Sequence, residues 1–179
     1  MANSKSAYSV AGKKQKNDTH IIVVWVDNEA GVLARVVGLF SGRGYNIESL
    51  SVSEVDSDRF LSRVTVVTSG TKNIIDQIKA QVRKLIPVHN LIDITELKSF
   101  IGKELILMKL DIKQKTVLEV HKHIKNIGAK ILFEDKTTII IEFSGTPTEI
   151  SGLIKKMKVY NIVELTRSGL VSMALGKDY

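Results

Sequence analysis

Residues 20–27 carry the longest apolar stretch of the chain, and this stretch predicts a central strand. Every position from Ile21 to Val26 holds a β-branched or aromatic residue. Such an unbroken run is typical of a strand that is covered on both faces, or on one face and at an interface. We therefore expect residues 20–27 to lie inside a sheet.

A helix is predicted directly after this strand. The apolar residues that follow Gly31 recur with the spacing of one helix face, namely Val32, Leu33, Val36, Val37, Leu39 and Phe40. Gly42 and Gly44 come next, and glycine at this position favours the end of a helix.

Two alternating segments then predict a hairpin. Apolar and polar residues alternate in residues 49–53 and again in residues 63–66, on either side of the polar turn at 56–59. Alternation of this kind is typical of strands that have one buried face. We therefore expect the hairpin to expose its other face to solvent.

A second helix and a fourth strand complete this unit. Apolar residues with helical spacing lie between the turn at 69–71 and Pro87, which the helix has to precede. Residues 91–97 then have the composition of a strand. The predicted order is strand, helix, strand, strand, helix, strand.

The same order starts again at Glu104. The elements predicted for this second unit are a strand at 105–112, a helix at 117–127 ended by Gly128, a hairpin of residues 131–133 and 139–143, a helix after Thr146, and a strand at 159–165. The last helix has a capping box, with Thr146 as N-cap, Pro147 at the first position and Glu149 reaching back.

Internal repetition supports two copies of one fold. The tripeptide at residues 69–71 recurs at 144–146, and the apolar positions after it keep the same phase. We predict an α+β protein with two ferredoxin-like βαββαβ domains in tandem, at residues 20–98 and 99–179, after a disordered basic tail at residues 1–19. The covered first strand suggests that the helix-free sheet face, or a sheet edge, serves dimerisation.

Composition narrows the possible functions. The net charge of +7 makes a phosphate-bearing partner an alternative, but residues 20–98 are neutral and the excess is divided between the tail (+3) and residues 99–179 (+4). The absence of cysteine excludes disulfides and thiolate sites and fits a reducing compartment. No apolar run approaches the ~20 residues of a membrane span. We therefore expect a cytoplasmic protein without membrane association.

Catalytic and nucleic-acid functions are not favoured. His20, His89, His121 and His123 have no acidic or serine partner at the sequence spacing of a nucleophile and its base, and the common zinc, hydrolase and phosphate-loop motifs do not occur. An RNA-binding sheet needs aromatic residues on its central strands, and the basic-glycine-aromatic pattern is missing. A DNA-linked sensor needs a helix-turn-helix, for which the 19 residues before His20 are too few and too polar.

The two loops that flank the first helix are the candidates for ligand chemistry. Gly31, which has no side chain, would let a small anion approach the amides at the positive end of the helix. Asn28 could cap the helix or hold a ligand, and Asn46 places an amide where the second strand begins. Judged alone, a turn or cap role suits Asn28 and Gly31 as well as a ligand role does.

The same loops carry a resemblance to a known family. The run from Asn28 to Ser41, followed by Arg43 to Leu50, resembles the regulatory small subunit of acetolactate synthase (acetohydroxyacid synthase). The resemblance covers residues 20–176 and includes the segments 62–63, 77–85, 103–109 and 162–169.

This resemblance implies an ACT domain, a βαββαβ amino-acid sensor, at residues 20–98, followed by the C-terminal domain characteristic of the subunit. It implies a chain that is not itself catalytic, forms a homodimer through its ACT domains and binds the large catalytic subunit. Such a subunit raises the activity of its partner and confers feedback inhibition by branched-chain amino acids, usually valine. The chain would carry no cofactor, whereas thiamine diphosphate, Mg and FAD are expected in the catalytic partner.

The resemblance also implies where the effector binds, namely between the ACT domains of two subunits. The matching positions are Asn28, Gly31, Val32 and Leu33 of one subunit, and Asn46 and Ile47 of the other. The second unit has Lys113 to Lys115 instead of a glycine-containing loop and Lys130 in place of Asn46, so we expect a ligand site in the first unit only. Ala30 and Ala34 stand where many members have Pro or Ser, and Ser, respectively, which bears on effector strength and selectivity.

Overall fold

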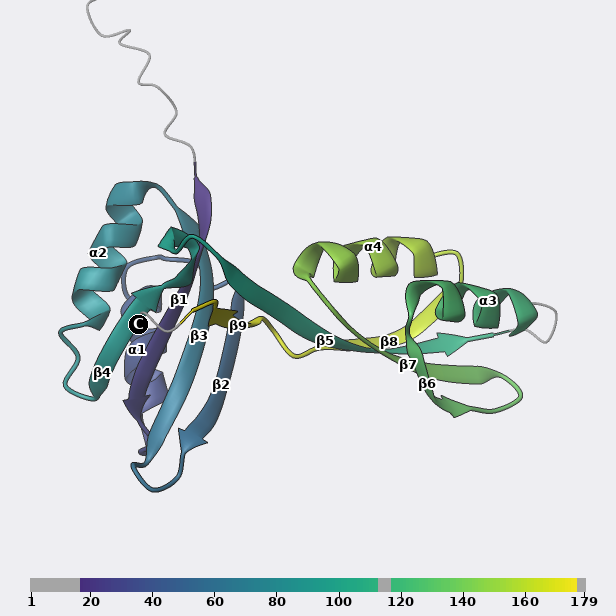
Figure 1. Cartoon of the computed structure of the whole chain (residues 1–179), viewed down its shortest axis with the longest axis horizontal. Helices are drawn as coiled ribbons and strands as arrows, with labels where there is room; N and C mark the ends of the chain where they lie inside the picture. The colour runs from purple at the N-terminus through teal and green to yellow at the C-terminus, as the bar shows by residue number, and fades with distance from the viewer. Residues whose placement is uncertain (1–16, 113–116, 177–179) are drawn as a thin grey trace, which may run out of the picture.

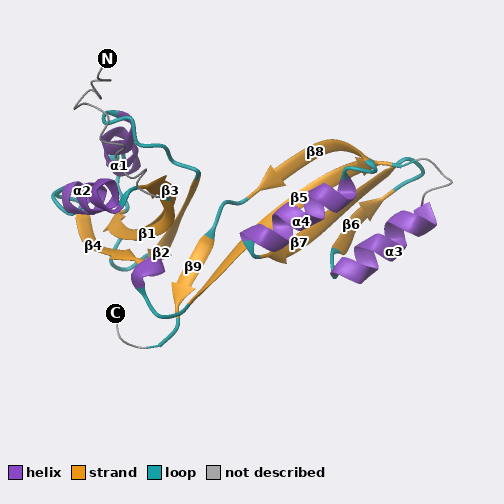
Figure 2. Cartoon of the chain, turned by 90° about the horizontal axis from the view of Figure 1, so that it is seen from above, coloured by secondary structure: helices purple, strands orange, loops and turns teal. Residues whose placement is uncertain are grey.

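The computed structural model of this chain describes residues 17–112 and 117–176 (Figure 1). Residues 1–16 of the predicted tail and the segment from Lys113 to Lys115 lie outside the described residues. The described chain forms two lobes, and each lobe is a sheet with two helices on one face (Figure 1, Figure 2).

The first lobe contains a four-stranded antiparallel sheet in the order β2-β3-β1-β4. Its elements are β1 (Asp18–Asp27), α1 (Val32–Ser41), β2 (Ser49–Asp56), β3 (Leu61–Gly70), α2 (Lys72–Val82) and β4 (Val88–Asp93). The predicted order is confirmed, although β1 includes two residues that we assigned to the tail. The strand predicted at residues 91–97 instead ends at Asp93, because the Asp93 side chain accepts a hydrogen bond from the Thr95 amide and starts the 3₁₀ turn η1 (Ile94–Glu96).

The second lobe repeats this strand order, as β6-β7-β5-β8. Its elements are β5 (Phe100–Asp111), α3 (Val117–Ile127), β6 (Lys130–Glu134), β7 (Thr138–Gly145), α4 (Pro147–Met157) and β8 (Asn161–Arg167). The predicted α+β class with two antiparallel sheets is therefore confirmed. The predicted capping box is present as well, because Thr146 Oγ1 accepts from the Glu149 amide and Glu149 Oε2 accepts from the Thr146 amide.

Strand β9 (Val171–Ala174) was not predicted from the sequence. After β8 the chain turns back toward the first lobe and forms β9, which pairs with residues 100–103 at the start of β5. As a result β5 begins five residues earlier than predicted and extends from the first lobe into the second (Figure 1). The division of the chain after residue 98 stays a prediction.

Each lobe has its own core between its sheet and its helices. In the first lobe, alternate β1 residues pack against the two helices, and the buried cluster includes Ile22, Val24, Val26, Val36, Phe40, Ile75 and Ile78. In the second lobe the equivalent cluster includes Ile106, Met108, Leu110, Val120, Ile141, Ile150 and Leu153. Of the apolar residues predicted on the face of the first helix, Val32, Val36 and Phe40 are buried, whereas Leu33 is 39% exposed.

A third apolar cluster covers the other face of the first sheet. It contains Ile21, Val23, Val67, Ile94 and Leu170, so it joins β1 and β3 to η1 and to the C-terminal segment. The prediction of a hairpin with one wet face is therefore wrong for β3, since Thr65 and Val67 are both buried. The central part of this face is occupied by the chain itself, and dimerisation through this face or through a sheet edge stays a prediction.

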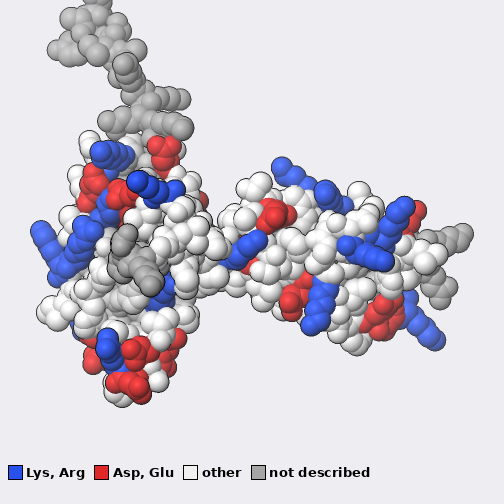
Figure 3. Space-filling view, viewed as in Figure 1, with Lys and Arg blue, Asp and Glu red and all other residues white. Residues whose placement is uncertain are grey.

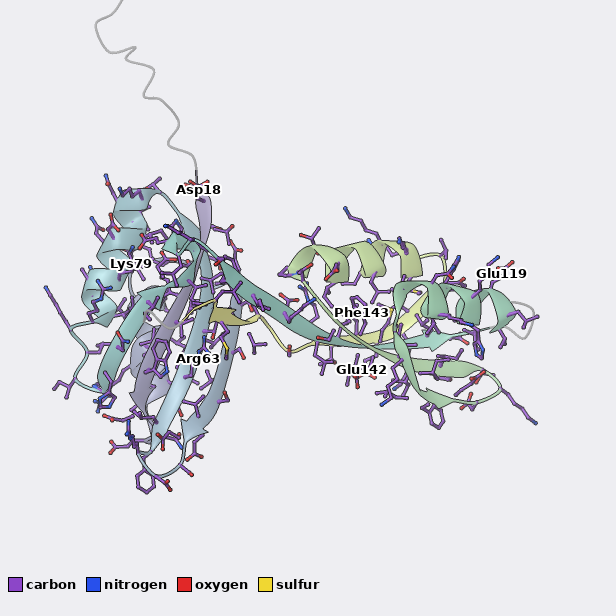
Figure 4. All side chains as sticks on the ribbon, viewed as in Figure 1. Asp18, Arg63, Lys79, Glu119, Glu142 and Phe143 are labelled. Atoms are coloured by element: carbon purple, nitrogen blue, oxygen red, sulfur yellow. The ribbon has the colours of Figure 1, made fainter. Side chains whose placement is uncertain are left out.

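A buried ionic network fixes the turn between the lobes. Lys79, on the buried side of α2, places its Nζ 2.5 Å from Glu96 Oε1, 3.2 Å from Asp76 Oδ1 and 3.7 Å from Asp93 Oδ2 (Figure 4). His20 Nδ1 lies 2.7 Å from the same oxygen, Asp93 Oδ2. Burial alone would lower the pKa of Lys79, but the hydrogen bonds to Glu96 and Asp76 and the nearby carboxylates outweigh it and raise this pKa.

Replacing Lys79 by methionine should destabilise the fold. The substitution keeps an unbranched side chain that is one atom shorter, but it removes the cation that faces Asp93, whose own side chain is fully buried. Leaving such a group without one partner costs about 1–3 kcal/mol of unfolding free energy, which urea denaturation can measure. Lys72→Met, at an exposed position of the same helix, is the control and should change stability by no more than about 0.5 kcal/mol.

The stability difference between the wild type and Lys79→Met should also depend on pH. Because folding raises the pKa of Lys79, its stabilisation is complete below the unfolded-state value of about 10.4 and disappears as pH rises through the folded-state value. The stability difference between the wild type and Lys79→Met should therefore be constant near neutrality and narrow above about pH 10.4. A difference that grew at alkaline pH would contradict this assignment.

Candidate functional site

The loop between β1 and α1 is held by Asn28. The backbone amide of Asn28 donates to the Phe60 carbonyl at 2.6 Å, and the side-chain oxygen Asn28 Oδ1 accepts from Ser62 Oγ at 3.0 Å. Asn28 therefore does not cap α1, which was one of its two possible roles. Its side chain instead ties the loop to the start of β3, and this places the loop at one end of the first sheet.

Gly31 is the N-cap of α1 and needs to be glycine. Its φ angle of 84° lies in the left-handed region, and no side chain caps the helix there. No atom outside its immediate neighbours lies within 4 Å of the position that a Cβ would occupy. Gly31 is itself exposed, so solvent reaches this end of α1.

The amides of the first turn divide into occupied and open donors. Val32 N donates to the Glu29 carbonyl at 3.3 Å, and Arg35 N donates to the Gly31 carbonyl at 3.0 Å. Leu33 and Ala34 have no acceptor for their amides among the residues that the structure describes. The open pair at the positive end of the helix is therefore Leu33 and Ala34, whereas the Val32 amide is engaged within the loop; the ligand role of Val32 that the resemblance implies stays a prediction.

The side chains beside these amides are apolar. Val32 is buried in the core of the first lobe, whereas Leu33 is 39% exposed beside the open donors. Ala34 was missed in the sequence, although the rule that the first four amides of a helix lack partners would have included it. This end of the lobe therefore offers amide donors next to aliphatic surface.

Asn46 and Ile47 lie in the connection from α1 to β2. The Asn46 carbonyl accepts from Thr68 Oγ1 at 2.7 Å, and the Glu48 amide donates to the Val67 carbonyl at 2.8 Å. The connection is thereby fixed to β3. The Asn46 side chain is exposed, and Ile47 is half-buried against the core of the first lobe.

The structure does not bring the two halves of the predicted site together within one chain. Strands β1 and β2 are both antiparallel to β3, so they run in the same direction. Position 49 at the start of β2 is level with position 21 near the start of β1, since both pair with Val67. Asn28 follows the far end of β1, at the opposite end of the sheet from Asn46, and a shared pocket would need a second chain.

The four histidines are spread over both lobes with separate partners. His20 lies near Asp93, His89 Nε2 is 2.5 Å from Asp27 Oδ1, and His121 Nε2 is 3.0 Å from Glu134 Oε1. His123 Nδ1 lies 2.6 Å from the Tyr160 hydroxyl. These acidic partners come from distant parts of the sequence, which is why sequence spacing did not show them. In residues 17–112 and 117–176, no three His, Cys, Asp or Glu residues cluster as a metal site would require.

The charges of the second lobe are mixed. Lys122 and Lys125 of α3 and Lys155 and Lys156 of α4 are exposed, and carboxylates lie among the basic groups on the face seen in Figure 3. That face lacks the continuous basic stripe that follows a phosphate backbone. A helix long and apolar enough to cross a membrane is not found in the described part of the chain.

Comparison with known proteins matches both halves of the chain to one family. Residues 22–90 match the family described as the ACT domain of AHAS small subunit-like proteins, and residues 103–176 match the small subunit of acetolactate synthase. The chain is 38% identical to a probable acetolactate synthase small subunit of Archaeoglobus fulgidus, over 88% of this chain and 97% of the relative. It is 33% identical to the isozyme 3 small subunit of Escherichia coli, over 87% and 95% of the two chains.

A solved structure shows the same arrangement. The acetolactate synthase small subunit of Thermotoga maritima superimposes with a TM-score of 0.83 at 27% identity, over 90% of this chain and 99% of that chain.

The left-handed conformation of Gly31 can be tested by a pair of alanine substitutions. Gly31→Ala should destabilise the protein by about 1–2 kcal/mol, because an L-residue is strained at this φ angle. Gly38→Ala in the interior of α1, where a Cβ also meets nothing within 4 Å, should instead stabilise it by about 0.5–1 kcal/mol. Chemical denaturation of both variants checks the opposite signs, and stabilisation by Gly31→Ala would show that this loop conformation is wrong.

Proposed function

The chain belongs to the family of acetolactate synthase small subunits, and from this premise we propose that it activates the large subunit and makes it sensitive to feedback inhibition by valine. As a small subunit it is not itself the catalytic chain, and its partner is the large catalytic subunit. We assign thiamine diphosphate, Mg and FAD to that partner. The observation that carries the effector proposal is the exposed N-terminus of α1, where Gly31 and Leu33 are exposed and the amides of Leu33 and Ala34 have no acceptor among the described residues.

This terminus has the chemistry that a free amino acid requires. The carboxylate of valine would accept hydrogen bonds from the amides of Leu33 and Ala34 at the positive end of α1. Its ammonium would bind the side-chain oxygen of Asn46 from a second chain, and its isopropyl group would lie against Ile47 and Leu33. The first lobe has no net charge over residues 20–98, which suits a zwitterion.

The arrangement of strands supports a homodimer formed through β2. One edge of β2 has no partner strand among residues 17–112 and 117–176, and Val52 and Val55 on β2 are 41% and 50% exposed. Antiparallel pairing of two β2 strands about a two-fold axis would place the start of one strand beside the end of the other. Asn46 of one copy would then approach the Asn28 and Gly31 end of its partner. Pairing through β4, the opposite edge, would keep these residues apart.

An enzyme assay with the large subunit tests this function. Addition of the chain should raise acetolactate synthase activity, and valine should then reduce it more effectively than leucine or isoleucine. Calorimetry of the isolated chain should show valine binding. If the chain neither changes the activity of its partner nor binds any of the three amino acids, the proposal fails.

Substitutions in the two halves of the site should remove inhibition without removing activation. Gly31→Asp places a carboxylate where that of valine would bind, and Asn46→Ala removes the proposed ammonium acceptor. Each should weaken valine binding at least about tenfold, corresponding to ~1.4 kcal/mol, in calorimetry and in the inhibition curve. Asn73→Ala, which alters an exposed asparagine on α2, is the matched control and should bind valine like the wild type.

A mixed dimer distinguishes a shared site from a site within one chain. Chains with Gly31→Asp and Asn46→Ala can be coexpressed with different affinity tags and purified as a heterodimer. In a shared arrangement one of the two sites then contains both defects and the other contains neither. The heterodimer should therefore bind one valine, whereas each variant homodimer binds none at the same concentration. Absence of binding to the heterodimer would contradict the shared site.

A further inference from the structure

The segment from Arg167 to Leu170 connects the second lobe to the first. Ser168 belongs to the second lobe, because its amide donates to the Leu105 carbonyl at 3.0 Å and its Oγ accepts from the Leu105 amide at 3.0 Å. Arg167 Nε donates to Glu104 Oε2 at 2.9 Å, and the Glu104 side chain is buried. Two neighbouring residues of the segment are thereby fixed to β5.

The next two residues contact the start of β2. The Leu170 amide donates to Ser49 Oγ at 3.1 Å. Gly169 has a φ angle of 78°, and a Cβ at this position would lie 2.9 Å from Ser49 Oγ and 3.1 Å from the Leu50 carbonyl oxygen. Glycine is therefore required both for the backbone angle and for the close contact. We refer to the contact of Gly169 and Leu170 with Ser49 and Leu50 as the joint.

The joint adjoins the proposed effector residues. Ser49 comes three residues after Asn46 along a segment that is fixed to β3. On its other side, Leu170 is 3% exposed and packs in the cluster that covers β1 and β3. A ligand that shifts the start of β2 must therefore either carry Leu170 with it or break the hydrogen bond to Ser49.

The surroundings of the joint leave room for such a shift. A cleft of about 570 Å³ lies beside it, lined by Glu48 and Leu50 of the first lobe and by Glu104, Pro147 and Arg167 of the second. Outside the joint and the strand pair of β5 with β9, the connection between the lobes is narrow in both views (Figure 1, Figure 2). A change in the relative position of the lobes thus has to alter the joint, the pair of β5 with β9 and the Arg63 hydrogen bond to the Ser172 carbonyl.

We propose that the joint transmits effector binding from the first lobe to the second, so that feedback inhibition depends on Gly169 although valine does not touch it. This inference rests on the proposed function. It makes Gly169 a coupling residue, distinct from the residues that bind the effector. Loss of coupling removes inhibition of the complex but leaves binding by the isolated small subunit intact.

Gly169→Ala tests the joint in the reconstituted complex with the large subunit. The added methyl group should displace Ser49 and Leu50 and raise the valine concentration for half-inhibition at least about tenfold, within the usual range of allosteric coupling. Valine binding to the isolated small subunit should stay within about threefold of the wild type, or ~0.65 kcal/mol. Activity without valine should be unchanged.

Gly128→Ala is the matched control. Gly128 has a similar φ angle of 71°, but a Cβ there would meet nothing within 4 Å. This variant carries the same backbone strain without touching β2, so it should be inhibited like the wild type. Ser49→Ala, which removes the acceptor for the Leu170 amide, should shift inhibition in the same direction as Gly169→Ala and decides the matter if that variant does not fold.

The possible failures are distinct. If the wild-type chain does not bind valine, the proposed function fails before the joint is tested. If the wild type binds and inhibits, and both Gly169→Ala and Ser49→Ala inhibit with an unchanged half-inhibition concentration, the joint does not transmit the signal. If Gly169→Ala loses binding in the isolated subunit by tenfold or more, the joint is part of the effector site and the coupling role is overturned.

Discussion

The structure depends on the burial of β1 from both sides. One face packs on the two helices of the first lobe, and the other face, through Ile21 and Val23, packs under the C-terminal segment. Leu170 supplies the apolar contact there. The guanidinium of Arg63 lies over the Trp25 ring, with Cζ 5.4 Å from the ring centroid, and it donates a hydrogen bond to the Ser172 carbonyl. The C-terminal segment around Leu170 therefore covers the helix-free face of the first sheet. Because the middle of that sheet face is covered, the proposed dimer has to form through a sheet edge.

The local pattern of the sequence was sufficient for most elements and insufficient for the contacts between lobes. Helix α4 begins where the capping box at Thr146 predicted, and α3 ends before Gly128, whose φ angle is 71°. Strand β9 was missed because its four residues acquire strand structure only by pairing with the start of β5. The burial of Lys79 could not be predicted either, because Asp93 and Glu96, the acidic partners that allow a lysine to be buried, contact it only in the folded chain.

The sequence predicted which loops form the candidate site, but it did not predict the contacts that their side chains make. Gly31 could be identified from the sequence because a glycine between a strand and a helix has few physical explanations. The role of Asn28 could not, since its partner Ser62 lies 34 residues away and only the sheet brings them together. The separation of Asn28 from Asn46 follows from strand direction, which a linear motif does not contain. The strand directions thus explain why the site that the family resemblance implies would need residues from two chains.

Strand direction also determines which chain would respond to each effector molecule. Asn46 and the joint lie at the same end of β2, whereas Gly31 of that chain lies at the other end of the sheet. In the proposed dimer, the carboxylate of an effector is thus held by the helix of one chain, while its ammonium acts on the β2 segment that leads to the joint of the other. Each bound effector would then act on the second lobe of only one chain, and its affinity would depend on residues of both chains. A monomer could have a complete joint and still lack a site, so in this arrangement dimerisation is a condition of regulation.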